Sequence, residues 1–230
     1  MPPDPDRLID PIYLPFTAGQ LARHFTGAAE RHIKQFEASA RAYREFLNSH
    51  SCLDGVAIDE ARASCQIEKD EQCWTATTLK QLFDAPARTR LLIQLLSRAF
   101  GPTPPCCGLE TWEDCLQGEL RLIFEAALPS PMAYQTWLRE HRREQHIIPY
   151  TLRAGDRRSL RSLEGPTKVD ALLVNLDNGF ALLVEAKVMS DLSGDVSFDA
   201  FRNQFARNVD VMLEAGGGHP WLAARRADRS

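Results

Sequence analysis

Three charged residues lie inside an otherwise apolar stretch and could support metal-dependent chemistry. The stretch "VDALLVNLDNGFALLVEAKV", residues 169–188, has two apolar runs on either side of a turn sequence. Asp170 lies in the first run, and Glu185 and Lys187 lie in the second. Charges in a half-buried sheet are costly unless they are paired or hold a metal ion. These positions therefore indicate a role beyond packing.

The turn sequence predicts which of these side chains share a face of the hairpin. Asn178-Gly179 favours a two-residue type I′ turn, because both residues tolerate the positive φ that this turn needs. Asp170 would then lie opposite Lys187. Opposed side chains point to the same face, and side chains alternate along a strand. We therefore expect Asp170, Glu185 and Lys187 on one face, whereas a three-residue loop would move Asp170 to the other.

The trio also interrupts an apolar face, which Leu172, Val174, Ala181 and Leu183 continue. Carboxylate oxygens are ligands that Mg²⁺ and Mn²⁺ prefer. A neighbouring lysine can orient a water molecule and offset the negative charge that develops on a phosphate. The pattern thus indicates hydrolysis of phosphodiester bonds. The alternative interpretation is a surface hairpin with a structural Glu–Lys pair.

The pattern D-x14-E-A-K on a hairpin resembles the PD-(D/E)XK nuclease superfamily. The resemblance covers roughly residues 111–215, although the proline that usually precedes the aspartate is absent. It implies a core of helix, three strands, helix and a last strand, and cleavage of nucleic acid with Mg²⁺ or Mn²⁺. It implies that Asp170, Glu185 and the carbonyl oxygen of Ala186 hold the metal, while Lys187 positions the water.

The resemblance also implies two supporting groups. Many members add a glutamate from the first core helix, and Glu125 is preferred here because its neighbours are apolar; Glu119, Glu140 and Glu144 are the alternatives. A polar residue on the helix after the hairpin often supports the site, and Gln204 resembles it. Arg207 lies on the same side of that helix. An ordinary solvated helix face explains Gln204 and Arg207 equally well.

The charge is unevenly distributed, with a net of −4 for the chain but eight Lys/Arg against four Asp/Glu in residues 139–168. Basic side chains near the trio are expected to contact the phosphate backbone without reading sequence. We expect DNA rather than RNA as the substrate. The predicted nucleic-acid-binding residues are Arg153, Arg157, Arg158, Arg161, Lys168, Arg202 and Arg207.

The expected fold class is α+β or α/β, with a helical domain followed by a restriction-endonuclease-like core in which helices flank a small mixed sheet. The predicted boundaries are a helical domain at 1–100, a linker at 101–110 and a nuclease domain at 111–230. Expected helices cover 17–50, 58–72, 87–100, 109–128, 129–145 and 195–215, and a strand covers 146–153. Because "HPWLAARRADRS" has no strand pattern, either the domain is truncated at its C-terminus or another segment fills that edge of the sheet.

The remaining sequence features predict a cytoplasmic protein without a membrane segment. Its first residues show no signal pattern, and its six cysteines lack zinc-site spacing. The acidic helical domain suits a protein partner or self-association into a homo-oligomer. The alternative function is a catalytically inactive nuclease-like domain that acts as a nucleic-acid or protein binding module.

Overall fold

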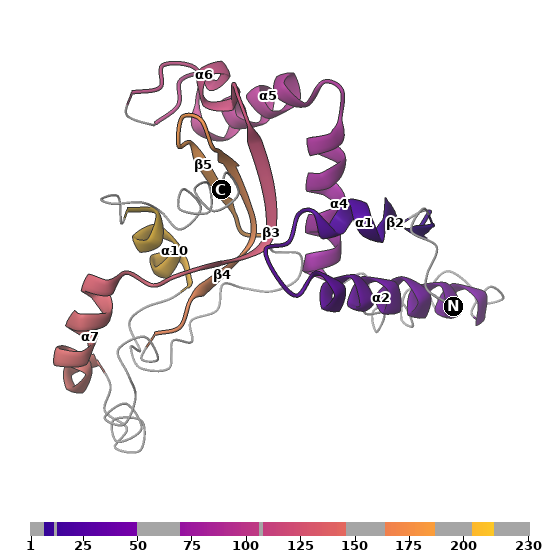
Figure 1. Cartoon of the computed structure of the whole chain (residues 1–230), viewed down its shortest axis with the longest axis horizontal. Coiled ribbons are helices and arrows are strands. Elements are labelled where there is room, and N and C mark those ends of the chain that lie inside the picture. Colours follow the sequence, from indigo (N-terminus) through magenta and orange to yellow (C-terminus); the bar gives the residue numbers. More distant parts are fainter. Residues whose placement is uncertain are drawn as a thin grey trace, which may run out of the picture. The chain divides into compact units, whose positions relative to one another are not determined.

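The computed structural model describes residues 7–11, 13–49, 70–105, 108–145, 164–186 and 204–213 (Figure 1). These residues form seven helices and two small antiparallel sheets, a mixed α+β structure. The chain forms two compact units. Unit 1 comprises Met1–Glu125 and Asp170–Met189, and unit 2 comprises Ala126–Val169 and Ser190–Ser230. In the described part, no helix combines the length and the apolar character that a membrane span requires.

The first segment of unit 1 is partly a sheet. Strands β1 (Leu8–Asp10) and β2 (Leu14–Thr17) pair antiparallel, and helices α1 (Ala18–Ala22) and α2 (Ala29–Ser49) follow. Thr17 and Gln20 form a capping box at the start of α1. The single helix predicted for 17–50 is wrong, because Ala28 has a φ of 52° and this left-handed residue separates the two helices.

Two further helices complete this part of unit 1. Helix α4 (Glu71–Asp84) is capped at its N-terminus by Asp70, whose side chain accepts a hydrogen bond from the Cys73 N–H. Helix α5 (Arg88–Phe100) confirms the prediction for 87–100 and ends at Gly101, which has a φ of 95°. The helix predicted for 58–72 lies mostly outside the described residues.

Residues 109–128 do not form the predicted helix. They contain the short helix α6 (Trp112–Leu116) and strand β3 (Leu120–Leu128). Gly118, at a φ of 111°, separates them with a conformation that a helix cannot contain. Buried and more exposed residues alternate along all of β3, which is the period of a strand. Glu125 therefore lies on a strand, not on the predicted core helix.

The hairpin forms as predicted, but its turn is longer. Strands β4 (Thr167–Asn175) and β5 (Ala181–Val184) pair antiparallel, with Leu172 opposite Leu183. The Asn175 N–H donates to the Phe180 carbonyl oxygen at 2.8 Å, so the loop has four residues, 176–179. The two-residue loop and the pairing of Asp170 with Lys187 are therefore wrong. The register shift is two residues, which leaves Asp170 and Glu185 on their predicted face.

The side chain of Asn175 explains the longer turn. Its Nδ2 donates to the carbonyl oxygens of Cys115 at 2.9 Å and Gln117 at 2.7 Å, and its Oδ1 accepts from the Asp177 N–H at 2.9 Å. Asn175 is fully buried. Because these contacts hold the end of β4 against the segment after α6, the strand ends there and the chain turns through four residues.

The hydrophobic core of unit 1 joins α1, α2, α4, α5 and α6 to one face of the β3-β4-β5 sheet. Phe36, Leu96 and Trp112 belong to this core, as do Phe124 on β3 and Ala171 on β4. The core thus draws on residues from both sides of the predicted linker at 101–110. The predicted domain boundaries themselves stay a prediction.

Unit 2 contains helix α7 (Met132–Gln145) and helix α10 (Gln204–Leu213). Helix α7 confirms the prediction for 129–145, and α10 lies within the predicted helix at 195–215. The strand predicted for 146–153 and the C-terminal segment "HPWLAARRADRS" lie outside the described residues.

Candidate functional site

Asp170 and Glu185 occupy facing positions on β4 and just beyond β5. Ala171 pairs with Val184, so Asp170 and Glu185 are the next two residues to face each other along these antiparallel strands. Both residues alternate with Ala171 and Val184, whose face packs on the unit 1 core. They therefore lie on the other face of the sheet, which also carries the buried Leu172. Both carboxylate-bearing residues are half-buried.

A backbone hydrogen bond links Asp170 to the segment that carries Glu185. The Ala186 N–H donates to Asp170 Oδ2 at 2.7 Å. This bond extends the hydrogen bonding between the two strand segments beyond Val184, the last residue of β5. A hydrogen bond to a charged acceptor is about twice as strong as a neutral one. The Asp170 side chain is therefore held beside the Glu185-Ala186 peptide.

Glu125 on β3 is aligned with this pair through the backbone. The Leu176 N–H donates to the Glu119 carbonyl oxygen at 3.0 Å, and β3 and β4 are neighbours in the antiparallel sheet (Figure 1). Following both strands from that bond brings Glu125 opposite Asp170. Glu125 has a φ of 50°, a costly conformation for a residue with a Cβ. Such strain is often found at functional sites.

The aligned backbone positions do not form a three-carboxylate cluster. Within the described ranges, no group of three or more His, Cys, Asp or Glu side chains is arranged to hold a metal ion. The sequence-predicted metal ligands Asp170, Glu185, Glu125 and the carbonyl oxygen of Ala186 all lie in the described part of the chain. All of these donors are oxygen atoms, which fits Mg²⁺ or Mn²⁺.

The alternative glutamates lie on other elements of the chain than Glu125. Glu119 precedes β3 at the turn end of the sheet, where its carboxylate pairs with Arg121 at 3.0 Å. Glu140 and Glu144 are exposed residues of α7 in unit 2. Glu125 is therefore the glutamate that lies on the strand next to Asp170, and Glu140 and Glu144 stay alternatives from the sequence.

Two further predicted site residues lie in the described part of the chain. Lys168, on β4, is exposed two residues before Asp170, and Gln204 is half-buried at the first position of α10. The other predicted residues lie outside the described part of the chain: Lys187, Arg153, Arg157, Arg158, Arg161 and Arg202.

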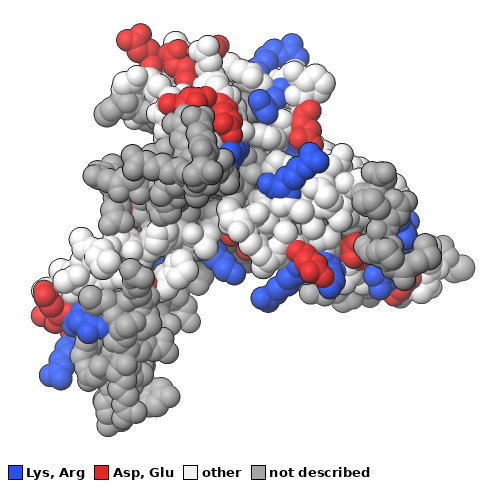
Figure 2. All heavy atoms as spheres, viewed as in Figure 1, with Lys and Arg blue, Asp and Glu red and all other residues white. Residues whose placement is uncertain are grey.

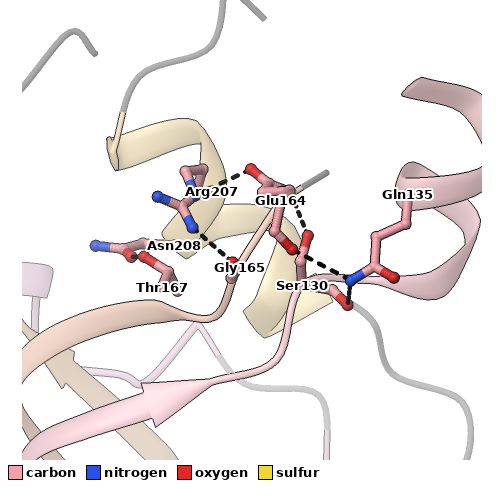
Figure 3. A network of polar contacts seen from close by, with 7 residues as sticks. All are labelled: Ser130, Gln135, Glu164, Gly165, Thr167, Arg207 and Asn208. Atoms are coloured by element: carbon pink, nitrogen blue, oxygen red, sulfur yellow. Dashed lines mark hydrogen bonds and ion pairs between the residues drawn. The ribbon is translucent and has the colours of Figure 1, made fainter. Parts of the chain in front are cut away.

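Arg207 belongs to a buried polar network in unit 2 (Figure 3). Its Nε lies 2.9 Å from Glu164 Oε1, and its Nη2 donates to the Gly165 carbonyl oxygen at 2.8 Å. The Glu164 side chain is 1% exposed and that of Arg207 is 19% exposed. The Ser130 hydroxyl donates to the other oxygen of Glu164. A buried carboxylate needs such partners, so the structure gives Arg207 a stabilising role.

The same network connects both helices of unit 2 to the start of β4. Gln135 Nε2 on α7 donates to the Ser130 carbonyl oxygen at 3.3 Å. Thr167 Oγ1 at the start of β4 donates to Asn208 Oδ1 on α10 at 3.0 Å. The sequence analysis missed Glu164 and its partners, because the network joins residues that lie far apart in the chain.

No protein-family model, curated protein or solved structure matches this chain. Its function must therefore be argued from its own residues and their geometry.

Proposed function

We propose that this protein is a metal-dependent nuclease with a PD-(D/E)XK-type site, which hydrolyses phosphodiester bonds in nucleic acid, with DNA as the favoured substrate. The observation that carries the proposal is the pair of facing carboxylates, Asp170 and Glu185, on a half-buried sheet face. Carboxylate oxygens from adjacent strands on one face of a sheet are suitable ligands for a divalent cation such as Mg²⁺ or Mn²⁺. Such a cation would supply the hydrolytic chemistry.

Each residue of the site has a defined role in this proposal. Asp170, Glu185 and the carbonyl oxygen of Ala186 would hold the cation. A bound Mg²⁺ or Mn²⁺ would polarise the phosphate and lower the pKa of a bound water. Lys187, two residues after Glu185 in the sequence, would orient the attacking water, as the resemblance implies. The resemblance also implies a supporting role for Gln204.

The restriction-endonuclease-like core is part of the same proposal. A helix, an antiparallel hairpin that carries the acidic residues, and a later helix are consistent with it. The first core helix that the resemblance implies is replaced by α6 and β3, so Glu125 would approach the site from a neighbouring strand.

A nuclease-like binding module is the second candidate. One observation favours it: Asp170 Oδ2 already accepts the Ala186 N–H, so this carboxylate also serves to hold the end of the hairpin. An aspartate kept for that purpose would survive the loss of catalysis. In that case the protein would bind nucleic acid without metal-dependent cleavage.

Cleavage assays with single-residue variants test the catalytic assignment. Supercoiled plasmid and single-stranded DNA would be incubated with Mg²⁺ or Mn²⁺ and the wild type, Asp170→Asn, Glu185→Gln or Lys187→Ala. Asparagine can still accept the Ala186 N–H, so Asp170→Asn should fold. We expect each variant to lose at least about 10- to 100-fold in rate, the range seen even for residues that only support a metal ligand.

The matched control is Glu45→Gln, which removes an exposed carboxylate from α2. It should cleave at the wild-type rate. Equal cleavage by all variants would refute the nuclease site. Calorimetry with Mn²⁺ separates the second candidate, because a binding module would give no heat with the metal and would still bind DNA.

A further inference from the structure

Helix α5 in unit 1 carries three arginines and no acidic residue. Arg90 and Arg98 are exposed, and so is Gln94, which lies midway between them. Residues four positions apart are neighbours on a helix surface, so these three side chains form one row. We call Arg90, Gln94 and Arg98 the α5 basic row. The carboxylate of Asp84, which precedes the helix, is paired with Lys80 at 2.5 Å.

An exposed leucine lies beside the α5 basic row. Leu95 is 48% exposed, whereas Leu92 and Leu96, which face away from the row, are buried in the unit 1 core. In a protein interface, an apolar centre is surrounded by polar and charged side chains. The exposed side of α5 therefore has the composition of an interface.

The neighbouring surface over α6 has the opposite charge. Residues 101–120 contain four acidic residues and no Lys or Arg. Two of these acidic residues, Glu110 and Glu113, are exposed at the start of α6. We call Glu110 and Glu113 the α6 acidic pair. Figure 2 shows acidic side chains over α6 and basic side chains over α5 on the same face of unit 1.

Helices α5 and α6 lie side by side, so the two charged surfaces keep a fixed spacing. Trp112 Nε1 on α6 donates to the carbonyl oxygen of Gly101, at the end of α5, at 2.9 Å. The rings of Phe100 and Trp112 have centroids 6.1 Å apart. Trp112 is also 3% exposed and belongs to the same core as the buried leucines of α5.

We propose that this protein forms a twofold dimer in which the α5 basic row of each copy contacts the α6 acidic pair of the other, with Leu95 inside the contact. A surface with a positive and a negative half is complementary to itself, because a twofold rotation places each half against the opposite half of a second copy. A second copy is therefore the partner that these charges favour. None of the residues assigned to the nuclease site takes part, so the two proposals are independent.

Sedimentation velocity of the full chain under reducing conditions measures the association. We expect a monomer–dimer equilibrium that shifts towards the monomer at about 1 M salt, where the Debye length falls to about 3 Å. The variants Arg90→Glu/Arg98→Glu and Glu110→Lys/Glu113→Lys reverse one half of the surface each. Each should raise the dissociation constant at least about 100-fold, because a twofold interface repeats every contact between like charges.

A mixture of the two variants is the decisive measurement. In a mixed dimer, the reversed row of one copy meets the reversed pair of the other, and the two unchanged halves also meet. The equimolar mixture should therefore dimerise as the wild type does, although neither variant dimerises alone. The matched control Arg31→Glu/Arg41→Glu makes the same change of net charge at exposed positions of α2 and should keep the wild-type dissociation constant.

Three results would overturn the proposal: a wild type that is monomeric at every concentration, a dimer that survives both charge reversals, or a mixture of the two variants that stays monomeric. Association that grows beyond two copies as the concentration rises would indicate a head-to-tail contact and would overturn the twofold dimer as well. Metal-dependent cleavage is measured separately, so its absence would leave the dimer standing, and a monomeric wild type would leave the nuclease site standing.

Discussion

The ion pair between Arg207 and Glu164 offers the sharpest test of how unit 2 is held together. The sequence analysis placed Arg207 at the phosphate backbone of a bound nucleic acid, whereas the structure pairs it with a carboxylate that is 1% exposed. Arg207→Met removes the charge and keeps most of the side-chain length. The buried Glu164 carboxylate then loses its cation, although the Ser130 hydroxyl still donates to it.

The expected cost follows from the burial of the pair. Removing one partner of a buried ion pair costs about 3–5 kcal/mol, because the other charge is left without compensation. Arg207 is 19% exposed, so water can partly solvate the site and the lower value, about 3 kcal/mol, applies. For a chain of this size each kcal/mol lowers the melting temperature by about 2–4 °C. We therefore expect a decrease of about 6–12 °C.

The assay is thermal unfolding followed by circular dichroism, with urea unfolding as a second measure. Arg121→Met is the matched control, because Arg121 and Glu119 form a pair at 3.0 Å whose side chains are 48% and 51% exposed. Exposed pairs contribute about 0–1 kcal/mol, so this variant should melt close to the wild type. The double variant Arg207→Met/Glu164→Gln removes both charges and should recover part of the lost stability.

Two results would refute this reasoning. If Arg207→Met melts like Arg121→Met, the ion pair does not stabilise the unit. If Arg207→Met also binds nucleic acid more weakly at unchanged stability, the sequence-based role of Arg207 at the phosphate backbone is the right one.

Three further predictions concern unit 1. Gly118→Ala should lower the free energy of unfolding in urea by about 1–3 kcal/mol, because a Cβ at this φ of 111° would collide with the Asp177 carboxylate. The control Gly27→Ala has open space around the new Cβ and should change that free energy by less than about 0.5 kcal/mol. Equal changes for the two variants would contradict the argument. Burial raises the pKa of the Cys73 thiol to about 12, so little reactive thiolate is present at pH 8. Peptide mass spectrometry should find Cys73 unalkylated by iodoacetamide at pH 8 in the folded protein and alkylated in urea. Rapid alkylation without urea would contradict the burial of this thiol. Burial also lowers the pKa of His24 below its usual 6.5. The neutral imidazole therefore favours the folded state above pH 6.5, and the free energy of unfolding falls as the pH drops towards the lowered pKa. Between about pH 6.5 and 5 this free energy should fall less for His24→Gln than for the wild type, and parallel decreases would contradict the argument.

Local patterns predicted several elements correctly. Helices α5 and α7 follow from their apolar spacing, and the hairpin follows from two apolar runs around Asn178-Gly179. The shared face of Asp170 and Glu185 also followed from the sequence, although the predicted turn was wrong. A shift of two residues preserves the alternation of side chains, so the face survived an error in the register.

Contacts between distant segments decided the rest. The segment 109–128 has apolar residues at spacings that suit a helix, yet its second half is β3, because a strand there can add to the hairpin and cover the unit 1 core. The buried ion pair of Arg207 was hidden from the sequence for the same reason: its partner Glu164 lies more than forty positions earlier in the chain.

The sequence by itself determined which residues could form a carboxylate site and on which face of a ribbon they would lie, since side-chain alternation is a local property of the backbone. Only the tertiary structure decided where the ribbon turns, because the turn depends on Asn175 bonding to the carbonyl oxygens of Cys115 and Gln117. It also decided which strand brings Glu125 to Asp170. Both outcomes depend on hydrogen bonds between residues 57 to 60 positions apart in the chain, which no local pattern encodes.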